Sequence, residues 1–191
     1  MTAGAPRISR LRLERAVAAL RRGGVVAYPT EAVWGLGCDP WDREAVLRLL
    51  VLKRRPLERG LILLAAAPED LTPFLAPLPP ERAAEIRGSW PGPVTWVVPS
   101  APEAPAWVTG GHAGIAVRVT AHPPAAALCR AFGGPVVSTS ANRSAGRPAR
   151  TASAVRYTFG PHLDALLPGP TGGLARPTPI RDAVTGAYLR H

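Results

Sequence analysis

Lysine is nearly absent from this 191-residue sequence, which has 23 basic residues and only one lysine, Lys53. Arginine does not replace lysine well where a compact point charge must contact a phosphate oxygen. Lys53 could be a chance survivor in an arginine-rich composition, and its rarity alone does not distinguish chance from function. The answer depends on where Lys53 lies in the predicted structure.

Cysteine and histidine are also scarce, with 2 and 4 residues. Cys38 and Cys129 form no C-x-x-C pair and have no histidine pair nearby, and the histidines themselves are not spaced as metal ligands. We therefore expect neither a disulfide framework nor a zinc site, and no metal bound by the protein itself.

Long apolar runs are missing as well. No run approaches the roughly 18 residues that a helix needs to cross a bilayer. Met1–Arg12 lacks the apolar segment of a signal peptide. We therefore expect a cytoplasmic protein with no membrane partner.

Three common nucleotide-binding and hydrolase motifs are absent. The sole lysine follows Leu52 and not a glycine, so there is no Walker A loop. Neither G-x-G-x-x-G nor G-x-S-x-G occurs in the chain. A polyphosphate would have to be bound by some other arrangement.

What the sequence does contain is a globular composition with a large positive charge. It is 47% hydrophobic and 19% charged, and its length is that of one domain, which we expect to span residues 1–191. Only 13 acidic residues oppose the basic ones, so the net charge is +10. That charge fits a nucleic-acid partner or an anionic substrate, although arginine-rich composition alone produces the same excess.

Apolar periodicity predicts helices and strands that alternate along the chain. Strands are expected at 24–28, 61–65, 94–98, 115–119 and 134–138, and helices at 13–20, 42–54, 68–75, 80–87, 123–132 and 151–159. Residues 30–40 and 99–114 are expected to be loops, and the C-terminal part to hold short strand-like pieces. This alternation indicates an α/β fold with a mixed, twisted sheet.

Lys53 continues the apolar stripe of the helix expected at residues 42–54. It follows Val46 by seven positions and Leu49 by four, so it should point toward the body of the protein and not into solvent. Pro56 then stops the helix, and Arg55 adds a second cation close by. Two cations that converge inward at a helix end indicate an anion site, most simply for a polyphosphate.

Polar side chains also gather where apolar strands end, which is the edge at which open α/β sheets bind ligands. Thr30 and Glu31 follow the first strand, and residues 138–142 (STSAN) follow the strand at 134–138. Ordinary turn chemistry explains both groups as well as ligand binding does. Arg118 lies in a strand opposite an apolar face, where a solvated sheet surface and an anion site are equally open.

Six segments in this order resemble the YrdC/TsaC-type threonylcarbamoyl-AMP synthases in their short bacterial form. The resemblance extends from Ala19 to Arg190. The segments are residues 28–37 (YPTEAVWGLG), 53–56 (KRRP), 89–95 (SWPGPVT), 116–119 (AVRV), 138–142 (STSAN) and 180–182 (IRD).

The resemblance implies a YrdC-like twisted mixed sheet with flanking helices and a basic concave cleft. It implies a nucleotidyltransferase that joins L-threonine, bicarbonate and ATP into threonylcarbamoyl-AMP and releases pyrophosphate. The product would serve the threonylcarbamoyladenosine modification of tRNA next to the anticodon, through a downstream threonylcarbamoyl-transfer complex. Mg²⁺ would enter with ATP, no cofactor would be tightly bound, and tRNA or double-stranded RNA is an expected partner.

The resemblance also implies roles for nine residues. Lys53 and Arg55 would neutralise charge on the triphosphate as the catalytic pair. The ATP-binding set is Lys53, Arg55, Ser138, Ser140, Asn142 and Arg190, and the threonine-binding set is Thr30, Arg118 and Thr178. The chain departs from longer relatives at Arg59, at Leu64 and at Thr178-Pro179, where those relatives have Asn, His and a Ser-Thr-Ile run.

Two other functions compete with this interpretation. A module that binds double-stranded RNA or tRNA, or an RNA maturation factor, in either case without catalysis, would explain the positive charge. RNA binding of that kind needs dispersed arginines and not one inward lysine beside a Ser/Asn loop. A carbamoyl-phosphate-processing accessory domain shares the fold family, but it usually occurs within longer chains that contain zinc fingers. The sequence favours the synthase.

Overall fold

The computed structural model describes residues 8–190. The expectation that Met1–Arg12 holds no signal peptide therefore lies partly outside the described residues. Within the described range, no helix is long and apolar enough to cross a membrane. The expectation of a single domain over residues 1–191 stays a prediction.

The described residues form a mixed nine-stranded sheet in the order β7-β1-β2-β6-β3-β5-β4-β8-β9. Parallel pairs (β1 with β7, β3 with β5, β4 with β8) are interspersed with antiparallel ones, as predicted for a mixed α/β sheet. The strands are β1 (Val26–Pro29), β2 (Trp34–Gly37), β3 (Ile62–Ala65), β4 (Thr95–Pro99), β5 (Gly114–Val119), β6 (Val136–Ser140), β7 (Ala165–Leu166), β8 (Ile180–Asp182) and β9 (Tyr188–Arg190).

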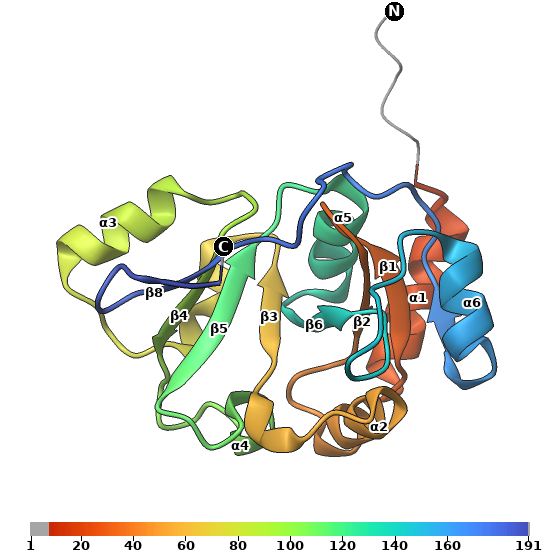
Figure 1. Ribbon diagram of the computed structural model, residues 1–191, viewed down its shortest axis with the longest axis horizontal. Helices are drawn as coiled ribbons and strands as arrows, with labels where there is room; N and C mark the ends of the chain where they lie inside the picture. Colours follow the sequence, from red (N-terminus) through yellow and green to blue (C-terminus); the bar gives the residue numbers. More distant parts are fainter. Residues whose placement is uncertain (1–7, 191) are drawn as a thin grey trace, which may run out of the picture.

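Helices flank this sheet (Figure 1), and two of them begin at a side-chain cap. Asp42 accepts a hydrogen bond from the Ala45 amide at 3.0 Å, and Thr151 accepts one from the Ala154 amide at 3.2 Å. The helices are α1 (Arg10–Arg21), α2 (Arg43–Lys53), α3 (Pro80–Gly88), α4 (Ala106–Thr109), α5 (Pro123–Phe132) and α6 (Ala152–Phe159), with 3₁₀ turns η1 (Leu57–Arg59), η2 (Pro68–Phe74) and η3 (Gly160–His162).

The two faces of the sheet pack against different helices. On one face, Val46 and Leu49 of α2 join a core cluster with Leu63 and Val117. On the other face, α1 and α5 pack with a second cluster that includes Leu64. Because side chains alternate along a strand, Ile62 lies on the same face as Leu64, beyond the area that this cluster covers.

The segment predicted as a glycine-rich loop at 30–40 contains strand β2, so that prediction was wrong. Its glycines serve packing and not a turn: a Cβ at Gly37 would lie 2.9 Å from the Tyr28 ring and 2.4 Å from the Val137 carbonyl oxygen. The Tyr28 ring is fully buried on the neighbouring strand. Glycine therefore marks a close approach here within a strand.

The expected loop at 99–114 was also partly wrong, because it contains the short helix α4. Pro105 precedes this helix, and Gly110 ends it with φ of 70°. A Cβ at Gly110 would lie 2.7 Å from the Gly60 nitrogen, so the turn after α4 fits closely against the chain before β3.

The chain between β7 and β8, residues 167–179, is called the strap below. It crosses from the α6 side of the molecule to the β8 side along one edge of the sheet, and is blue in Figure 1. Its amides bond back to the turn after β1: Gly172 N to Thr30 O at 3.0 Å, and Leu174 N to Glu31 O at 3.0 Å. The strap thereby brings Thr178 to the sheet face that α1 and α5 leave open.

Candidate functional site

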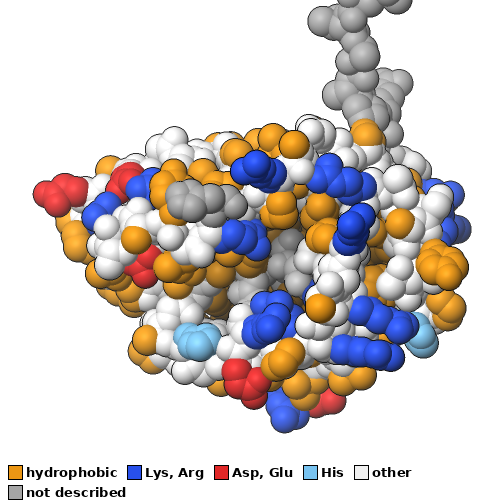
Figure 2. Space-filling view, in the orientation of Figure 1, with side chains coloured by type: hydrophobic (Ala, Val, Ile, Leu, Met, Phe, Trp, Pro, Cys, Tyr) orange, Lys and Arg blue, Asp and Glu red, His pale blue; other side chains and the backbone are white. Residues whose placement is uncertain are grey.

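The floor of a cleft is formed by four residues that lie side by side across the sheet. The strand register pairs Ile62 with both Ser138 and Ala116, and Ala116 with Val97. All four line a cavity of about 590 Å³. Figure 2 shows the hollow in this face of the molecule, with Lys and Arg side chains around it.

Polar residues mark the two ends of this cleft. Ser140 lies two positions beyond Ser138 on β6, whereas Arg118 lies opposite Leu64, two positions beyond Ile62 on the parallel strand β5. At about 3.3 Å per residue the two ends are separated by about 13 Å along the strands. The cleft can therefore hold an elongated ligand that meets different chemistry at each end.

Arginines supply the cationic groups that line the cleft. They are Arg55, Arg59, Arg118 and Arg190. Burial, together with a neighbouring arginine, lowers the pKa of Arg55 and of Arg190 from the ordinary arginine value. An anion that entered the cleft would stabilise the charged form of both guanidinium groups.

Lys53 is buried, 3% exposed, as its place in the helical stripe predicted. It does not line the cleft. Its Nζ instead donates to the carbonyl oxygens of Ser140 and, at 2.7 Å, of Asn142, and its own carbonyl accepts from the Ser144 amide at 2.8 Å. Lys53 thus ties the end of α2 to the back of the loop that follows β6.

Burial and the charge of Arg55 together lower the pKa of Lys53 to about 8. A lysine side chain with this pKa is mostly protonated at neutral pH and loses its charge at mildly alkaline pH.

The loop after β6 is held by its own side chains. Ser140 Oγ donates to Asn142 Oδ1 at 2.6 Å, and Asn142 Nδ2 donates to the carbonyl oxygens of Arg143 and Gly146 at 2.8 and 2.9 Å. The sequence argument expected both Ser140 and Asn142 to face the cleft. In the structure Ser140 lines it, while the Asn142 side chain is engaged within the loop.

Arg55 reaches the same end of the cleft from the chain after α2. Its Nη2 donates to the carbonyl oxygen of Gly60 at 2.9 Å and to that of Arg59 at 3.2 Å. Its Nε is buried and has no hydrogen-bond partner among the described residues. An anion in the cleft would meet a guanidinium that is already fixed on one side.

Arg118 is buried, 5% exposed, so the alternative of a solvated sheet face was wrong. Its Nη1 donates to Thr178 Oγ1 at 2.9 Å, and its Nη2 lies 3.2 Å from Glu31 Oε2. The other Glu31 oxygen accepts from Thr120 Oγ1 at 2.6 Å. A strand, the turn after β1 and the strap therefore meet in one buried polar network.

Arg190 also lies toward this end, and Thr30 lies between the two ends: its Cγ2 would be 3.4 Å from a Cβ at Gly35, which is paired with Ser140, while the adjacent Glu31 pairs with Arg118. The Thr30 hydroxyl donates to the Val33 carbonyl oxygen at 2.7 Å, which is turn chemistry, and the residue still lines the cleft. Arg190 Nη2 donates to the Thr178 carbonyl oxygen at 2.8 Å. Seven of the nine expected residues thus line one cleft, and Lys53 and Asn142 lie behind its wall.

Several residues of the site were not expected from the sequence. Glu31 was noted at the end of the first strand, with ligand binding and turn chemistry both open, but no role was assigned to it, and its partner Arg118 is far away in the chain. His112, whose Nε2 lies 2.6 Å from the Glu58 carbonyl oxygen, lines the cleft from the segment predicted as a loop. Of the three departures from longer relatives, Arg59 and Thr178 line the cleft, while Leu64 is fully buried in the second core cluster.

Residues 8–190 hold no cluster of three His, Cys, Asp or Glu side chains that could ligate a metal ion. Cys38 and Cys129 are free and buried. Burial raises the pKa of Cys38, and raises that of Cys129 to about 12, so both stay protonated thiols at neutral pH.

Comparison with known proteins agrees over nearly the whole chain. The family model Sua5_yciO_yrdC, described as telomere recombination, matches residues 18–191. The chain is 64% identical over 179 residues to the threonylcarbamoyl-AMP synthase of Halorhodospira halophila, a match that covers 94% of both proteins. It is 56% identical over 184 residues to the protein of the same name from Alkalilimnicola ehrlichii, covering 95% of this chain and 96% of that one.

Solved structures share the fold. P. abyssi Sua5 complexed with L-threonine superposes with a TM-score of 0.88 and 31% identity over 93% of this chain. The match covers 52% of that Sua5 chain, so the present chain spans about half its length. E. coli YciO has a TM-score of 0.85 at 23% identity, covering 98% of this chain and 91% of that one, which is a likeness of fold.

Proposed function

The chain belongs to the Sua5/YciO/YrdC family, and we propose that it is a threonylcarbamoyl-AMP synthase. It would join L-threonine, bicarbonate and ATP and release pyrophosphate. The observation that carries this proposal is the 64% identity, over 94% of both chains, to a protein of that name. The elongated cleft, with different polar groups at its two ends, supports it from geometry.

The chemistry needs positioning more than it needs a nucleophile on the protein. The amine of threonine and bicarbonate condense to a carbamate with loss of water, and a carbamate oxygen attacks the α-phosphorus of ATP while pyrophosphate leaves. Holding the two reactants in line and stabilising the charge on the triphosphate supply most of the catalysis of such a transfer.

We assign ATP to the end of the cleft where Arg55, Ser138 and Ser140 lie. Arg55 would pair with phosphate oxygens through its guanidinium, and the two hydroxyls would orient them. Lys53 and Asn142 would act on the triphosphate through the loop that they hold, with the charge of Lys53 adding to the field. Mg²⁺ would enter bound to ATP, because triphosphate oxygens are ligands that this ion prefers.

We assign threonine to the other end. Arg118 would bind the carboxylate, and Thr30 and Thr178 would contact the polar groups of the amino acid. Arg190 bonds to the Thr178 carbonyl oxygen, so it would reach ATP where the nucleotide meets the amino acid, close to the reacting α-phosphate. The P. abyssi Sua5 complex with L-threonine supports an amino-acid site in this fold.

The product would pass to a downstream complex that transfers the threonylcarbamoyl group to tRNA. We propose the cytoplasm as its compartment, since ATP and tRNA substrates are found there. Direct binding of tRNA or double-stranded RNA is proposed in addition to catalysis, and the +10 charge supports it. A purely RNA-binding function is not favoured, because the curated relatives are named as synthases.

Pyrophosphate release tests the proposal. We expect release from ATP to require both L-threonine and bicarbonate, because the attacking carbamate forms from the two. The assay omits each substrate in turn and uses D-threonine as a control of the same composition. Release at the full rate without threonine would identify a plain ATP pyrophosphatase and reject the assignment.

A further inference from the structure

Glu31 is a buried carboxylate behind the Arg118 end of the cleft, to which the proposed function gives no role. It is 8% exposed. One oxygen accepts from Thr120 at 2.6 Å, and the other lies 3.2 Å from Arg118 Nη2. Glu31 does not itself line the cleft, so it can influence a ligand only through Arg118 or through the chain that it anchors.

Arg118 is held at both of its terminal nitrogens. Thr178 accepts from Nη1, and the Glu31 carboxylate pairs with Nη2. The Nε of Arg118 is buried and has no hydrogen-bond partner among the described residues. A guanidinium held by a hydrogen bond at one terminal nitrogen and by an ion pair at the other has its remaining N–H donors oriented before a ligand arrives, which reduces the entropy loss of ordering a long side chain on binding.

The backbone of Glu31 also binds the strap, which carries Thr178, the second partner of Arg118. The Glu31 carbonyl oxygen accepts from the Leu174 amide of the strap at 3.0 Å. The fit is close, because a Cβ at Gly172 would lie 3.0 Å from both the Cα and the carbonyl oxygen of Glu31. The same strap continues to Thr178, so Glu31 fixes both Arg118 and the segment that presents Thr178.

The charge of Glu31 matters as much as its position. A buried arginine without a counter-ion attracts any small anion that can reach it. With Glu31 beside it, Arg118 is already compensated. A carboxylate then has to gain its binding from hydrogen bonds in the correct geometry and not from net charge alone.

We propose that Glu31 is the positioning residue of the amino-acid end of the cleft. It orients Arg118 and balances its charge, so that this end selects a carboxylate carried by an amino acid over free small anions. The inference rests on the proposed function, in which Arg118 binds the carboxylate of threonine.

The deciding variant is Glu31→Gln, which keeps the length of the side chain and an acceptor for Thr120 but removes the charge. We expect the Kd for L-threonine, measured by calorimetry, to rise about tenfold. The Kd for a non-hydrolysable ATP analogue should change less than about threefold. Threonine binding should also become sensitive to added chloride or acetate, which a purely structural role would not cause.

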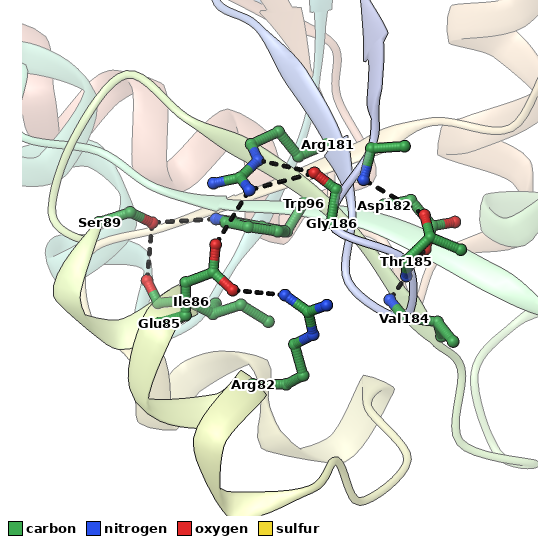
Figure 3. A network of polar contacts seen from close by, with 11 residues as sticks. Arg82, Glu85, Ile86, Ser89, Trp96, Arg181, Asp182, Val184, Thr185 and Gly186 are labelled. Carbon is green, nitrogen blue, oxygen red and sulfur yellow. Dashed lines mark hydrogen bonds and ion pairs between the residues drawn. The ribbon is translucent and has the colours of Figure 1, made fainter.

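Glu85→Gln is the matched control. Glu85 also pairs with arginines, Arg82 at 2.6 Å and Arg181 at 2.9 Å, but in a network between α3 and the β8–β9 hairpin whose residues do not line the cleft (Figure 3). It removes the same charge from the same type of pair. We expect its threonine affinity and its response to chloride to match those of the wild type.

Glu31→Asp separates the effect of the negative charge from the effect of side-chain length. It keeps the carboxylate but shortens it by one methylene, so threonine affinity should fall while the response to chloride stays as in the wild type. Glu31→Asp also tests the positioning role of Glu31 if Glu31→Gln does not fold. In that case weaker binding of threonine, with ATP-analogue binding unchanged, supports the proposal, and wild-type threonine affinity overturns it.

The outcomes keep the two proposals apart. If the wild type does not bind L-threonine, the assignment of this end of the cleft fails, whatever the variants do. If the wild type binds threonine and Glu31→Gln binds it equally well without sensitivity to chloride, the role of Glu31 is overturned and the assignment of the cleft stands.

Discussion

Among the single residues, Lys53 donates hydrogen bonds to two carbonyl oxygens from a space that an arginine side chain would not fit. An ammonium group donates in three directions, and Lys53 uses two of its donors on the carbonyl oxygens of Ser140 and Asn142. A guanidinium is broad and planar, so it would have to displace the loop to reach both oxygens. This geometry gives a physical reason for one lysine in an otherwise arginine-rich chain.

Substitution of Lys53 tests that reason. We expect Lys53→Ala to lose most turnover while the protein stays folded, because the loop that carries Ser140 loses two hydrogen bonds from a charged donor, each worth about 1.5–3 kcal/mol. Lys53→Arg should also be impaired. The measurements are kcat for pyrophosphate release and thermal unfolding. Full activity of Lys53→Arg would show that the compact ammonium is not needed.

The lowered pKa of Lys53 predicts a pH dependence with a definite sign. The pKa in the folded protein is about 8, below the ordinary 10.5 of the unfolded chain. Between these values the unfolded state binds more protons, so the contribution of Lys53 to the free energy of unfolding should rise with pH. The neutral amine keeps donors for both carbonyl oxygens, so the loop should stay in place while the charge is lost.

From pH 8 upward we therefore expect the protein to become more stable while its binding of ATP becomes weaker. The free energy of unfolding should rise relative to Lys53→Met, which lacks the titrating group, and the KM for ATP should rise as the cation disappears. Denaturant unfolding and ATP titrations at matched pH measure them. A Lys53→Met difference that is constant over this range would contradict the lowered pKa.

At the element scale, the sequence predicted those parts of the fold that local chemistry specifies. Helix α2 begins at its Asp42 cap and α6 at its Thr151 cap, and the stripe that ends at Lys53 is buried as expected. Strand β2 was missed because its glycines give room to the Tyr28 ring on another strand, which no local pattern records. Contacts between distant segments were the main source of error.

In the cleft, too, features set by local sequence could be predicted and contacts between distant segments could not. Polar residues at strand ends predicted a shared site, because the ends of neighbouring strands meet at one edge of the sheet. The pairing of Arg118 with Glu31 could not be predicted in this way, since it depends on strand β5 and the turn after β1, which meet only in the fold. Nor could the sequence show that the Asn142 side chain turns into its own loop.

The loop after β6 and the turn after β1 should affect different substrates. Asn142→Ala removes three hydrogen bonds that order the loop, so the KM for ATP should rise about tenfold or more. Thr30→Ala should weaken the use of threonine more than that of ATP. Titration of each substrate against each variant measures both effects. Equal damage to both substrates by both variants would reject the division of the cleft.

At the scale of the whole molecule, charge is distributed unevenly along the chain. No acidic residue occurs between Glu103 and Asp164, a stretch that carries six of the arginines. Five of them are exposed: Arg130, Arg143, Arg147, Arg150 and Arg156. Exposed arginines of this kind offer phosphate contacts that do not depend on base sequence.

We therefore expect tRNA and duplex RNA to bind at low salt and to dissociate steeply as salt rises, because each arginine that pairs with a phosphate releases a condensed counterion.

In a plot of log K against log salt, Arg147→Gln combined with Arg156→Gln should lower the slope by about one for each arginine–phosphate pair that the substitutions remove. Arg10→Gln combined with Arg43→Gln, which also removes two charges but from residues paired with Glu14 at 2.8 Å and with Glu44 at 3.0 Å, should change the slope less. Fluorescence anisotropy over a salt series measures all three proteins. Binding that ignored salt and depended on RNA sequence would mean that base recognition dominates, and would make RNA recognition a primary function of the cleft face.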